Sequence, residues 1–431
     1  MDIKTRTAKI LKPMGRVSIK YYLLLAAAGA TLVWFFYAWS YMLEHGLIAT
    51  GLVDWGSGGG TPWGVYIGSF IWWVGIAHGG IIISAAVRLF NLKTLRPVAR
   101  IAELLTISAL IAAVMFILLH LGRPDRIVTS IIPAFPWTIA SSPLIWDVTI
   151  ITLYFCLTAT YLILSLRRDL FALRARLPRF FAPVYYLLQL GYRPEEDEKV
   201  ERMVWWLALG VIILAPLLLH GGVIPWLFAL IPSMPGWYGA IQGPTFLSIA
   251  LTSALGGAIV IAAIFRKVYG WEEILPDKTF RMLGAGLMLF ALLFLWLQLQ
   301  QNITGLYAPP VSVEHVIEAK FSALYWLAIG LVATSVAYLG AQLIRPSLFS
   351  LGRIVIAAIL PLTATLLEKV LFVVEGPLEP AFSLYRAVPG IYSPSWIELS
   401  AVLGSIALVV ILFMIFIKVI PVVEVTGEEE G

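Results

Sequence analysis

The sequence has little charge and a single cysteine. Charged residues make up 13% of its 431 residues, about half the share in a typical soluble domain. Cys156 can form no disulfide within the chain, and it cannot hold an iron–sulfur cluster, which needs about four thiolates. With 60% hydrophobic residues, these shortages exclude a water-soluble enzyme, a disordered chain and a nucleic-acid-binding protein.

Long apolar stretches dominate what is present. A helix crosses a bilayer with about 20 residues, and ten stretches reach that length. We therefore predict an all-α polytopic membrane protein with about ten transmembrane helices. The expected spans are residues 21–43, 65–89, 98–121, 144–166, 204–220, 246–265, 280–302, 321–344, 354–374 and 397–420.

Lysine and arginine gather on one side of these spans. Four lie in segments on the other side, Arg123, Arg126, Lys320 and Arg386, and Lys369 lies within the ninth span. The remaining 25 of the 30 lie in the two tails and the loops on the same side as the tails. Cytoplasmic loops carry such an excess, so we expect both termini in the cytoplasm.

The chain is predicted to have four parts. Residues 1–45 are a basic tail and the first helix, 62–222 and 243–375 are two four-helix bundles, and 396–431 are the last helix and an acidic tail. Both bundles begin with an aromatic segment rich in glycine and proline, and Gly79-Gly80 recurs as Gly256-Gly257. Repeats in the same direction favour parallel bundles over an inverted repeat. The long inner loop 167–202 has no assigned role.

Titratable side chains in a bilayer are costly and usually face a bundle interior or a site. Those within the expected spans are His78, Glu103, His120, Asp147, His220, Glu368, Lys369 and Glu398. His120 ends the third span and Asp147 opens the fourth, both at the outer side. The sequence favours neither of two interpretations: the pair accepts protons from a quinol, or it caps helix ends. Arg123 either pairs with Asp147 or binds a carbonyl of the quinone head group.

The other titratable groups also have two interpretations. His78 lies in the middle of its span, where it either contacts a substrate or is a buried neutral histidine bonded to a neighbour. Glu103 lies near the inner end of the third span and either admits protons or pairs with Arg100. The histidines His78, His120 and His220 lie at only two depths, which disfavours a buried haem pair.

In the second bundle, Gln298, Gln301 and Asn302 share one helix face, and Glu368 lies in the middle of the ninth span. Together they form either a proton path or, for the amides, hydrogen bonds between helices. Lys369 follows Glu368 directly, so we expect it to point elsewhere.

Five segments in order resemble the polysulfide reductase NrfD family of integral membrane subunits. They are TPWGVYIGSFIWWVGIAHGG, LLHLGRPDR, SSPLIWDVTIITLYF, PGWYGAIQGPTF and YSPSWIELSAVLGSIALVVILFMIFIKVIPV. The likeness covers nearly the whole chain. The last two segments resemble the ten-helix branch, which includes quinol-oxidising subunits of alternative complex III and of membrane complexes linked to dissimilatory sulfite reduction.

This resemblance implies a quinone-interacting subunit of a respiratory complex in the plasma membrane of a prokaryote. Menaquinol would bind in the first bundle near the outer face, beside a ferredoxin-type iron–sulfur subunit docked outside, since this chain is expected to hold no haem or cluster. The family's catalytic histidine and aspartate match His120 and Asp147, and its second-helix histidine matches His78. A carboxylate associated with proposed proton movement matches Glu368. The expected site residues are, for catalysis, Asp147 and His120; for quinone binding, His78, Trp146, Arg123 and Ser142; and for a proton path, Glu368, Gln298, Gln301 and Glu103.

Two other functions use the same residues. A secondary transporter would move a solute without a partner, and a structural anchor would tolerate the loss of Asp147 and His120. The nearly uncharged outer segments 46–63, 123–142 and 221–243 favour a docked partner, although plain interfacial loops would look the same. No metal site is expected.

Overall fold

The computed structural model describes residues 3–15, 17–53, 63–138, 141–215, 223–231, 234, 236–237, 239–307, 320–378 and 392–425. Every regular element in these ranges is a helix. Nine of the described helices are long and apolar enough to cross a membrane. The predicted all-α polytopic fold is therefore confirmed.

Most helix bounds agree with the sequence-based spans to within a few residues. The nine candidate spans are α2 (Ile19–His45), α3 (Val65–Leu89), α4 (Arg96–His120), α6 (Pro143–Leu173), α10 (Gln242–Tyr269), α11 (Asp277–Tyr307), α13 (Ala323–Ile344), α14 (Leu351–Leu378) and α15 (Trp396–Val419). The other helices are α1 (Ile3–Gly15), α5 (Ile132–Thr138), α7 (Ala182–Leu188), α8 (Asp197–Ala215) and α9 (Ile224–Ala229). Local signals set several ends: Pro97 lies at the start of α4, and Gly122 follows its end with a φ of +63°.

The fifth expected span corresponds to α8, which begins at Asp197 and is 19 residues long. Five of its first six residues are charged, which shortens its apolar part and keeps it out of the nine candidates. It packs against α3 and α6 in the first bundle. Residues 216–222, with His220, lie outside the described residues, as does Arg386.

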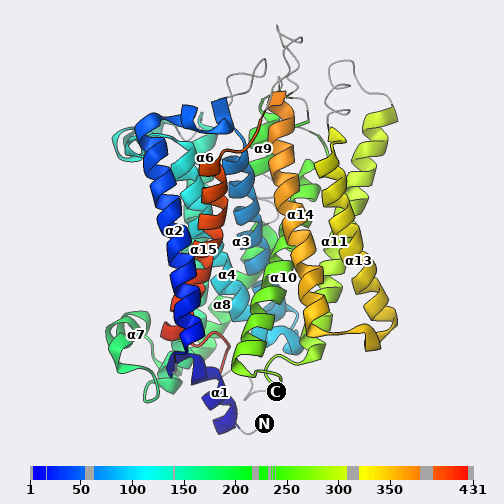
Figure 1. Cartoon of the computed structure of the whole chain (residues 1–431). Helices are drawn as coiled ribbons and strands as arrows, with labels where there is room; N and C mark the ends of the chain where they lie inside the picture. The colour runs from blue at the N-terminus through cyan, green and yellow to red at the C-terminus, as the bar shows by residue number, and fades with distance from the viewer. Residues whose placement is uncertain are drawn as a thin grey trace.

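Both ends of the chain lie at the same end of the helix bundle (Figure 1). We call this the terminal end, formed by α1 and residues 420–425, and we call the opposite end the distal end. Lys418 at the end of α15 donates a hydrogen bond to the carbonyl oxygen of Pro13 at 2.5 Å. Arg100 of α4 donates to the carbonyl oxygen of Val423 at 3.3 Å. The two chain ends are thus tied to each other, and the C-terminal end is also tied to α4 of the first bundle.

Helices α3 and α10 pack against each other at the centre of the molecule. A Cβ added to Gly79 would lie 2.4 Å from the Cβ of Ala254, so only glycine allows this close approach. Gly80 lies equally close to α4, where an added Cβ would be 2.9 Å from the carbonyl oxygen of Ala102. Gly256 allows α10 to approach α14 closely, because a Cβ added there would lie 2.9 Å from the carbonyl oxygen of Ala358.

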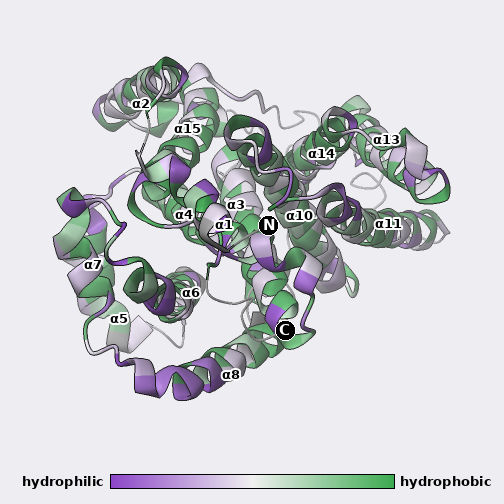
Figure 2. Ribbon diagram, turned by 90° about the horizontal axis from the view of Figure 1, so that it is seen from below, coloured by the Kyte–Doolittle hydropathy of each residue, from purple (hydrophilic) through white to green (hydrophobic). Residues whose placement is uncertain are grey.

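Two helices flank the first bundle. Seen along the axis, α2 and α15 lie side by side at one edge, and α11 and α13 lie at the other (Figure 2). The indole nitrogen of Trp73 in α3 donates to the hydroxyl of Ser405 in α15 at 2.9 Å. Glu398, one of the acids in the expected spans, begins α15 in a capping box with Ser395, so its position is explained structurally.

Candidate functional site

His120 and Asp147 lie at the distal end of two helices that contact each other, α4 and α6. Asp147 is buried, with 8% of its surface exposed. Among the described residues, its Oδ1 atom and the Nδ1 atom of His120 are buried without a hydrogen-bond partner. These two atoms are therefore not bonded to each other, and the N-cap of α6 is Ser142 rather than Asp147. The expected role as helix caps finds no support.

An aromatic cluster covers His120. The ring of Trp63 meets the imidazole edge to face at 6.2 Å and stacks on Trp237 at 5.2 Å. Phe228 of α9 contacts both indoles at 5.4 and 5.0 Å. Sequence reasoning did not place Trp63, Phe228 or Trp237 in the site. The signal was present, however, because Trp63 and Trp237 belong to the two similar segments that precede the bundles.

The other residues expected at this end are arranged differently. Ser142 is half-buried, and its side chain makes no capping hydrogen bond. Trp146 is half-buried next to Asp147. Arg123 donates two hydrogen bonds of 2.8 Å to the carboxylate of Asp125, so the expected pairing of Arg123 with Asp147 is not found. That pair is exposed, and the guanidinium lowers the pKa of Asp125.

His78 lies deeper in the first bundle than the Asp147–His120 pair. Its ring lies 4.3 Å from that of Tyr154, and its Nδ1 is 2.7 Å from the carbonyl oxygen of Val74. Tyr154 follows Asp147 by seven residues, which is two helical turns and about 11 Å along the axis. The hydroxyls of Tyr154 and Thr158 are buried without a partner among the described residues. Asp147, Tyr154 and Thr158 thus form a row of polar groups that runs inward along α6.

Glu103 is fully buried near the terminal end of the same bundle. It accepts hydrogen bonds from Ser84 at 2.6 Å and from Ser165 at 3.3 Å, and it lies 3.7 Å from Arg88. Of the two interpretations of Glu103, pairing with Arg100 is not found, because Arg100 instead forms an ion pair of 2.5 Å with Asp169. Sequence spacing offers no means of choosing between two acids that are close to Arg100 only in the folded chain.

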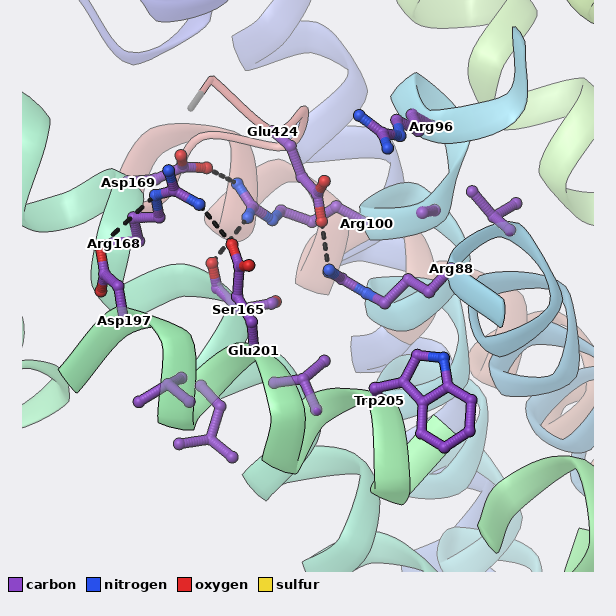
Figure 3. A pocket seen from close by; sticks show the side chains of 15 residues that line it. Arg88, Arg96, Arg100, Ser165, Arg168, Asp169, Asp197, Glu201, Trp205 and Glu424 are labelled. Carbon is purple, nitrogen blue, oxygen red and sulfur yellow. Dashed lines mark hydrogen bonds and ion pairs between the residues drawn. The ribbon is translucent and has the colours of Figure 1, made fainter. Parts of the chain in front are cut away.

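A charged cavity of about 340 Å³ opens beside this group at the terminal end. Figure 3 shows side chains of α3, α4, α6 and α8 pointing into it, together with Glu424, which forms an ion pair with Arg88. Its charged lining residues are Arg88, Arg96, Arg100, Arg168, Asp169, Asp197, Glu201 and Glu424. Four cations face four anions, so the cavity is polar without a net charge.

The residues expected to form a proton path in the second bundle do come together. Gln298, Gln301 and Glu368 line a cavity of about 600 Å³ between α10, α11, α13 and α14. The ammonium of Lys320 donates to the amide oxygens of Gln298 and Gln301 at 3.2 and 3.1 Å. Burial lowers the pKa of Lys320, and the carboxylates of Glu375 and Glu368 oppose that shift.

Two features of this part of the second bundle were not predicted. Lys320 and Glu375 line it, although the first was counted only as a charge on the outer side. Lys369 was expected to point away from Glu368, but its ammonium lies 3.2 Å from the Glu368 carboxylate and 3.2 Å from the centre of the Phe246 ring. A long side chain can curl back toward its neighbour, which helical spacing alone does not show.

The described residues contain no group of three or more histidine, cysteine, aspartate or glutamate side chains arranged to hold a metal ion.

Comparisons with known proteins identify the family. The family description "Polysulphide reductase, NrfD" matches residues 55–381. The chain is 34% identical to a putative dimethyl sulfoxide reductase membrane subunit of Halobacterium salinarum over 53% of its own length, a match that spans about half (48%) of that relative. It is 25% identical to a selenate reductase subunit of Mesobacillus selenatarsenatis over 84% of this chain and 86% of that one. It is 24% identical to an Hdr-like menaquinol oxidoreductase integral membrane subunit of Archaeoglobus fulgidus over 96% of both chains. This polytopic membrane protein belongs to the polysulphide reductase NrfD family.

Proposed function

We propose that the chain is the quinone-interacting membrane subunit of a respiratory oxidoreductase complex. It oxidises menaquinol, or reduces menaquinone, at the distal end of the first bundle and exchanges electrons with an iron–sulfur subunit. The observation that carries this proposal is the Asp147–His120 pair, a buried and a half-buried titratable side chain that each keep a buried polar atom without a partner among the described residues. A buried polar atom of this kind costs about 1–3 kcal/mol unless something bonds to it.

The pair has the chemistry that a quinol needs. Oxidation of a quinol to a quinone releases two protons and two electrons. The Asp147 carboxylate accepts the proton of one hydroxyl, and the His120 imidazole accepts that of the other. The two electrons leave for a redox centre in another subunit, because a single cysteine provides too few thiolates for a cluster. Trp146 and the aromatic cluster, which includes Trp63, provide flat apolar surfaces for the quinol ring.

Names of the relatives agree with this role. One relative is named as an integral membrane subunit of a menaquinol oxidoreductase, and two are named as subunits of reductases. For the present chain we propose the same kind of assembly. The lysine and arginine distribution supports a cytoplasmic terminal end, so the quinone and the partner subunit would be on the outer side of a prokaryotic plasma membrane.

Proton movement is a further part of the proposal. Ser165, which donates to Glu103, lines the charged cavity at the terminal end and follows Thr158 by seven residues on α6. In the second bundle, Glu368, Gln298 and Gln301 line a cavity that also holds the half-buried ammonium of Lys320. Both sets place hydrogen-bonding side chains inside the bundles, and we propose that they carry protons.

The test is the quinone content of the complex purified in mild detergent. We expect quinone to co-purify with an iron–sulfur partner and to be lost in Asp147→Asn, which keeps the shape but removes the acceptor charge. Glu44→Gln, which changes an exposed carboxylate on α2 at the same end, should keep the quinone. A chain that purifies without partner or quinone, yet moves a solute across liposomes, would instead be a transporter.

A further inference from the structure

A loop segment of the first bundle projects from the terminal end. Residues 174–190, which include α7, form most of the connection between α6 and α8. In the side view α7 lies level with the end of the bundle and beyond its edge, and the axial view shows it at the periphery, outside α6 and α4 (Figures 1 and 2). We call residues 174–190 the α7 segment.

One side of the α7 segment is fixed to the bundle. Tyr185 is buried, and its hydroxyl donates to the carbonyl oxygen of Val419 at 2.8 Å, at the end of α15. Arg167 of α6 donates to the carbonyl oxygen of Leu188 at 3.0 Å. Leu177 is also buried. Burial raises the pKa of Tyr185 to about 12, so this hydroxyl remains a donor. The segment is therefore held in one orientation.

The other side presents apolar side chains outward. Phe180, Tyr186 and Leu187 are 87%, 74% and 68% exposed, and Leu190 and Val184 are exposed as well. These are five large apolar side chains within eleven residues. A water-exposed loop rarely shows such a patch, and a patch of this kind marks a contact with a membrane or a protein.

The charge of the segment is of one sign. From residue 174 to residue 190 the sequence has three arginines and no acid. Arg174, Arg176 and Arg179 are all exposed. Basic residues beside exposed aromatic and aliphatic side chains are typical of segments that lie in the plane of a membrane surface, where arginines attract anionic head groups. The position of the segment, level with the helix ends, puts it at that surface.

We propose that the α7 segment lies in the head-group layer of the terminal-side leaflet and binds anionic phospholipid. Its apolar side chains enter the boundary of the acyl chains, and its arginines contact lipid phosphates. Tyr185 and Arg167 hold this surface at a fixed height against α15 and α6. A protein subunit covering the same patch is the competing occupant, but the uniform positive charge fits an anionic membrane better.

A spin label measures the position of the patch directly. In a Cys156→Ala background, Leu187→Cys is labelled in the purified complex and reconstituted into phosphatidylcholine vesicles with or without phosphatidylglycerol. We expect the label to be accessible to oxygen, shielded from a water-soluble nickel chelate, and deeper when phosphatidylglycerol is present. Glu198→Cys, an exposed site at the start of α8, is the matched control and should be open to the chelate.

Two results would overturn the proposal. A label at 187 as open to the chelate as the label at 198 would place the patch in water. A label shielded from both reagents in the intact complex would mean that a protein covers it. Neither readout involves electron transfer, so the outcome is independent of the quinone site.

Charge is tested separately. Phosphatidylglycerol retained by the purified complex should fall at least twofold in the triple variant Arg174→Gln, Arg176→Gln, Arg179→Gln. Lys267→Gln removes an exposed cation from the last turn of α10, also at the terminal end. This variant should retain the wild-type amount of phosphatidylglycerol. Equal retention by the triple variant and the wild type would contradict a role for these arginines.

Discussion

At the scale of single residues, the buried acids of the first bundle differ in their partners. Asp169 pairs with Arg100, and Glu103 has two serine donors and a nearby arginine. Asp147 has an oxygen with no protein partner among the described residues. The first two acids are satisfied by the fold itself. Asp147 requires a ligand or water, which is why we assign it and not the others to substrate.

Lys320 gives a prediction on pH. Burial lowers its pKa in the folded protein, whereas an unfolded chain keeps the ordinary value of about 10.4. Between these two values the unfolded state binds more protons, so the free energy of unfolding contributed by this group rises with pH. We expect the stability of the wild type relative to Lys320→Met to increase as pH rises toward about 10. Thermal unfolding of both proteins in detergent across this range measures the difference.

A difference that stays constant or falls over the same pH range would contradict the placement of the Lys320 ammonium against Gln298 and Gln301 inside the cavity. Comparing the two proteins at each pH removes the contribution of the tyrosines and other lysines, since these titrate in both.

At the scale of elements, the crossing of α3 and α10 depends on Gly79. An added Cβ would lie 2.4 Å from Ala254 and 2.6 Å from the carbonyl oxygen of Ala250, so the helices must separate. We expect Gly79→Ala to destabilise the protein by about 1–3 kcal/mol, the range for overpacked cores. Thermal unfolding in detergent tests this.

Gly29→Ala in α2 is the matched control, because nothing lies within 4 Å of a Cβ at that position. Alanine favours helix over glycine, so this variant should be as stable as the wild type or more so. Equal stability of the two variants would show that α3 and α10 do not pack this closely.

The helices themselves were largely predictable from the sequence. Hydropathy reports directly on the length of chain that lipid can cover, and α3 coincides with its expected span, Val65–Leu89. The helix of the fifth expected span, α8, begins at Asp197 rather than at residue 204, because its charged first turn is helical as well as the apolar run that follows.

Side-chain partners were less predictable. Asp147, His120, Glu103 and Glu368 stand out in the sequence because charge is rare in apolar spans. Nothing in the sequence indicates that Arg100 pairs with Asp169 or that Lys320 reaches Gln298. These partners are far apart in the chain, and only the packing of the helices brings them together.

At the scale of the whole molecule, the two bundles have polar cavities at opposite ends. The charged cavity of the first bundle lies at the terminal end, and that of the second lies toward the distal end, beside Lys320 and Gly236. The Trp63–Trp237 stack joins the bundles at the distal end, next to His120. The two bundles therefore meet beside His120 at the distal end as well as at the crossing of α3 and α10.

The orientation of the molecule is also testable. We expect an impermeant maleimide to label Glu44→Cys from outside intact spheroplasts, because the distal end faces outward in our proposal. Glu195→Cys at the terminal end should react only after the membrane is opened. Both variants carry Cys156→Ala. Labelling of Glu195→Cys in intact cells would reverse the topology and place the Asp147–His120 pair at the cytoplasmic face.

The central claim is that Asp147 and His120 take protons from a quinol. Its most direct test is the steady-state rate of quinol oxidation by the purified complex carrying Asp147→Asn, with Glu44→Gln as the control. Loss of one positioned base typically lowers a rate by about 10²–10⁴-fold, and we expect kcat to fall by about 100-fold or more while the control retains the wild-type rate. Quinol oxidation by Asp147→Asn at the wild-type rate would contradict the assignment.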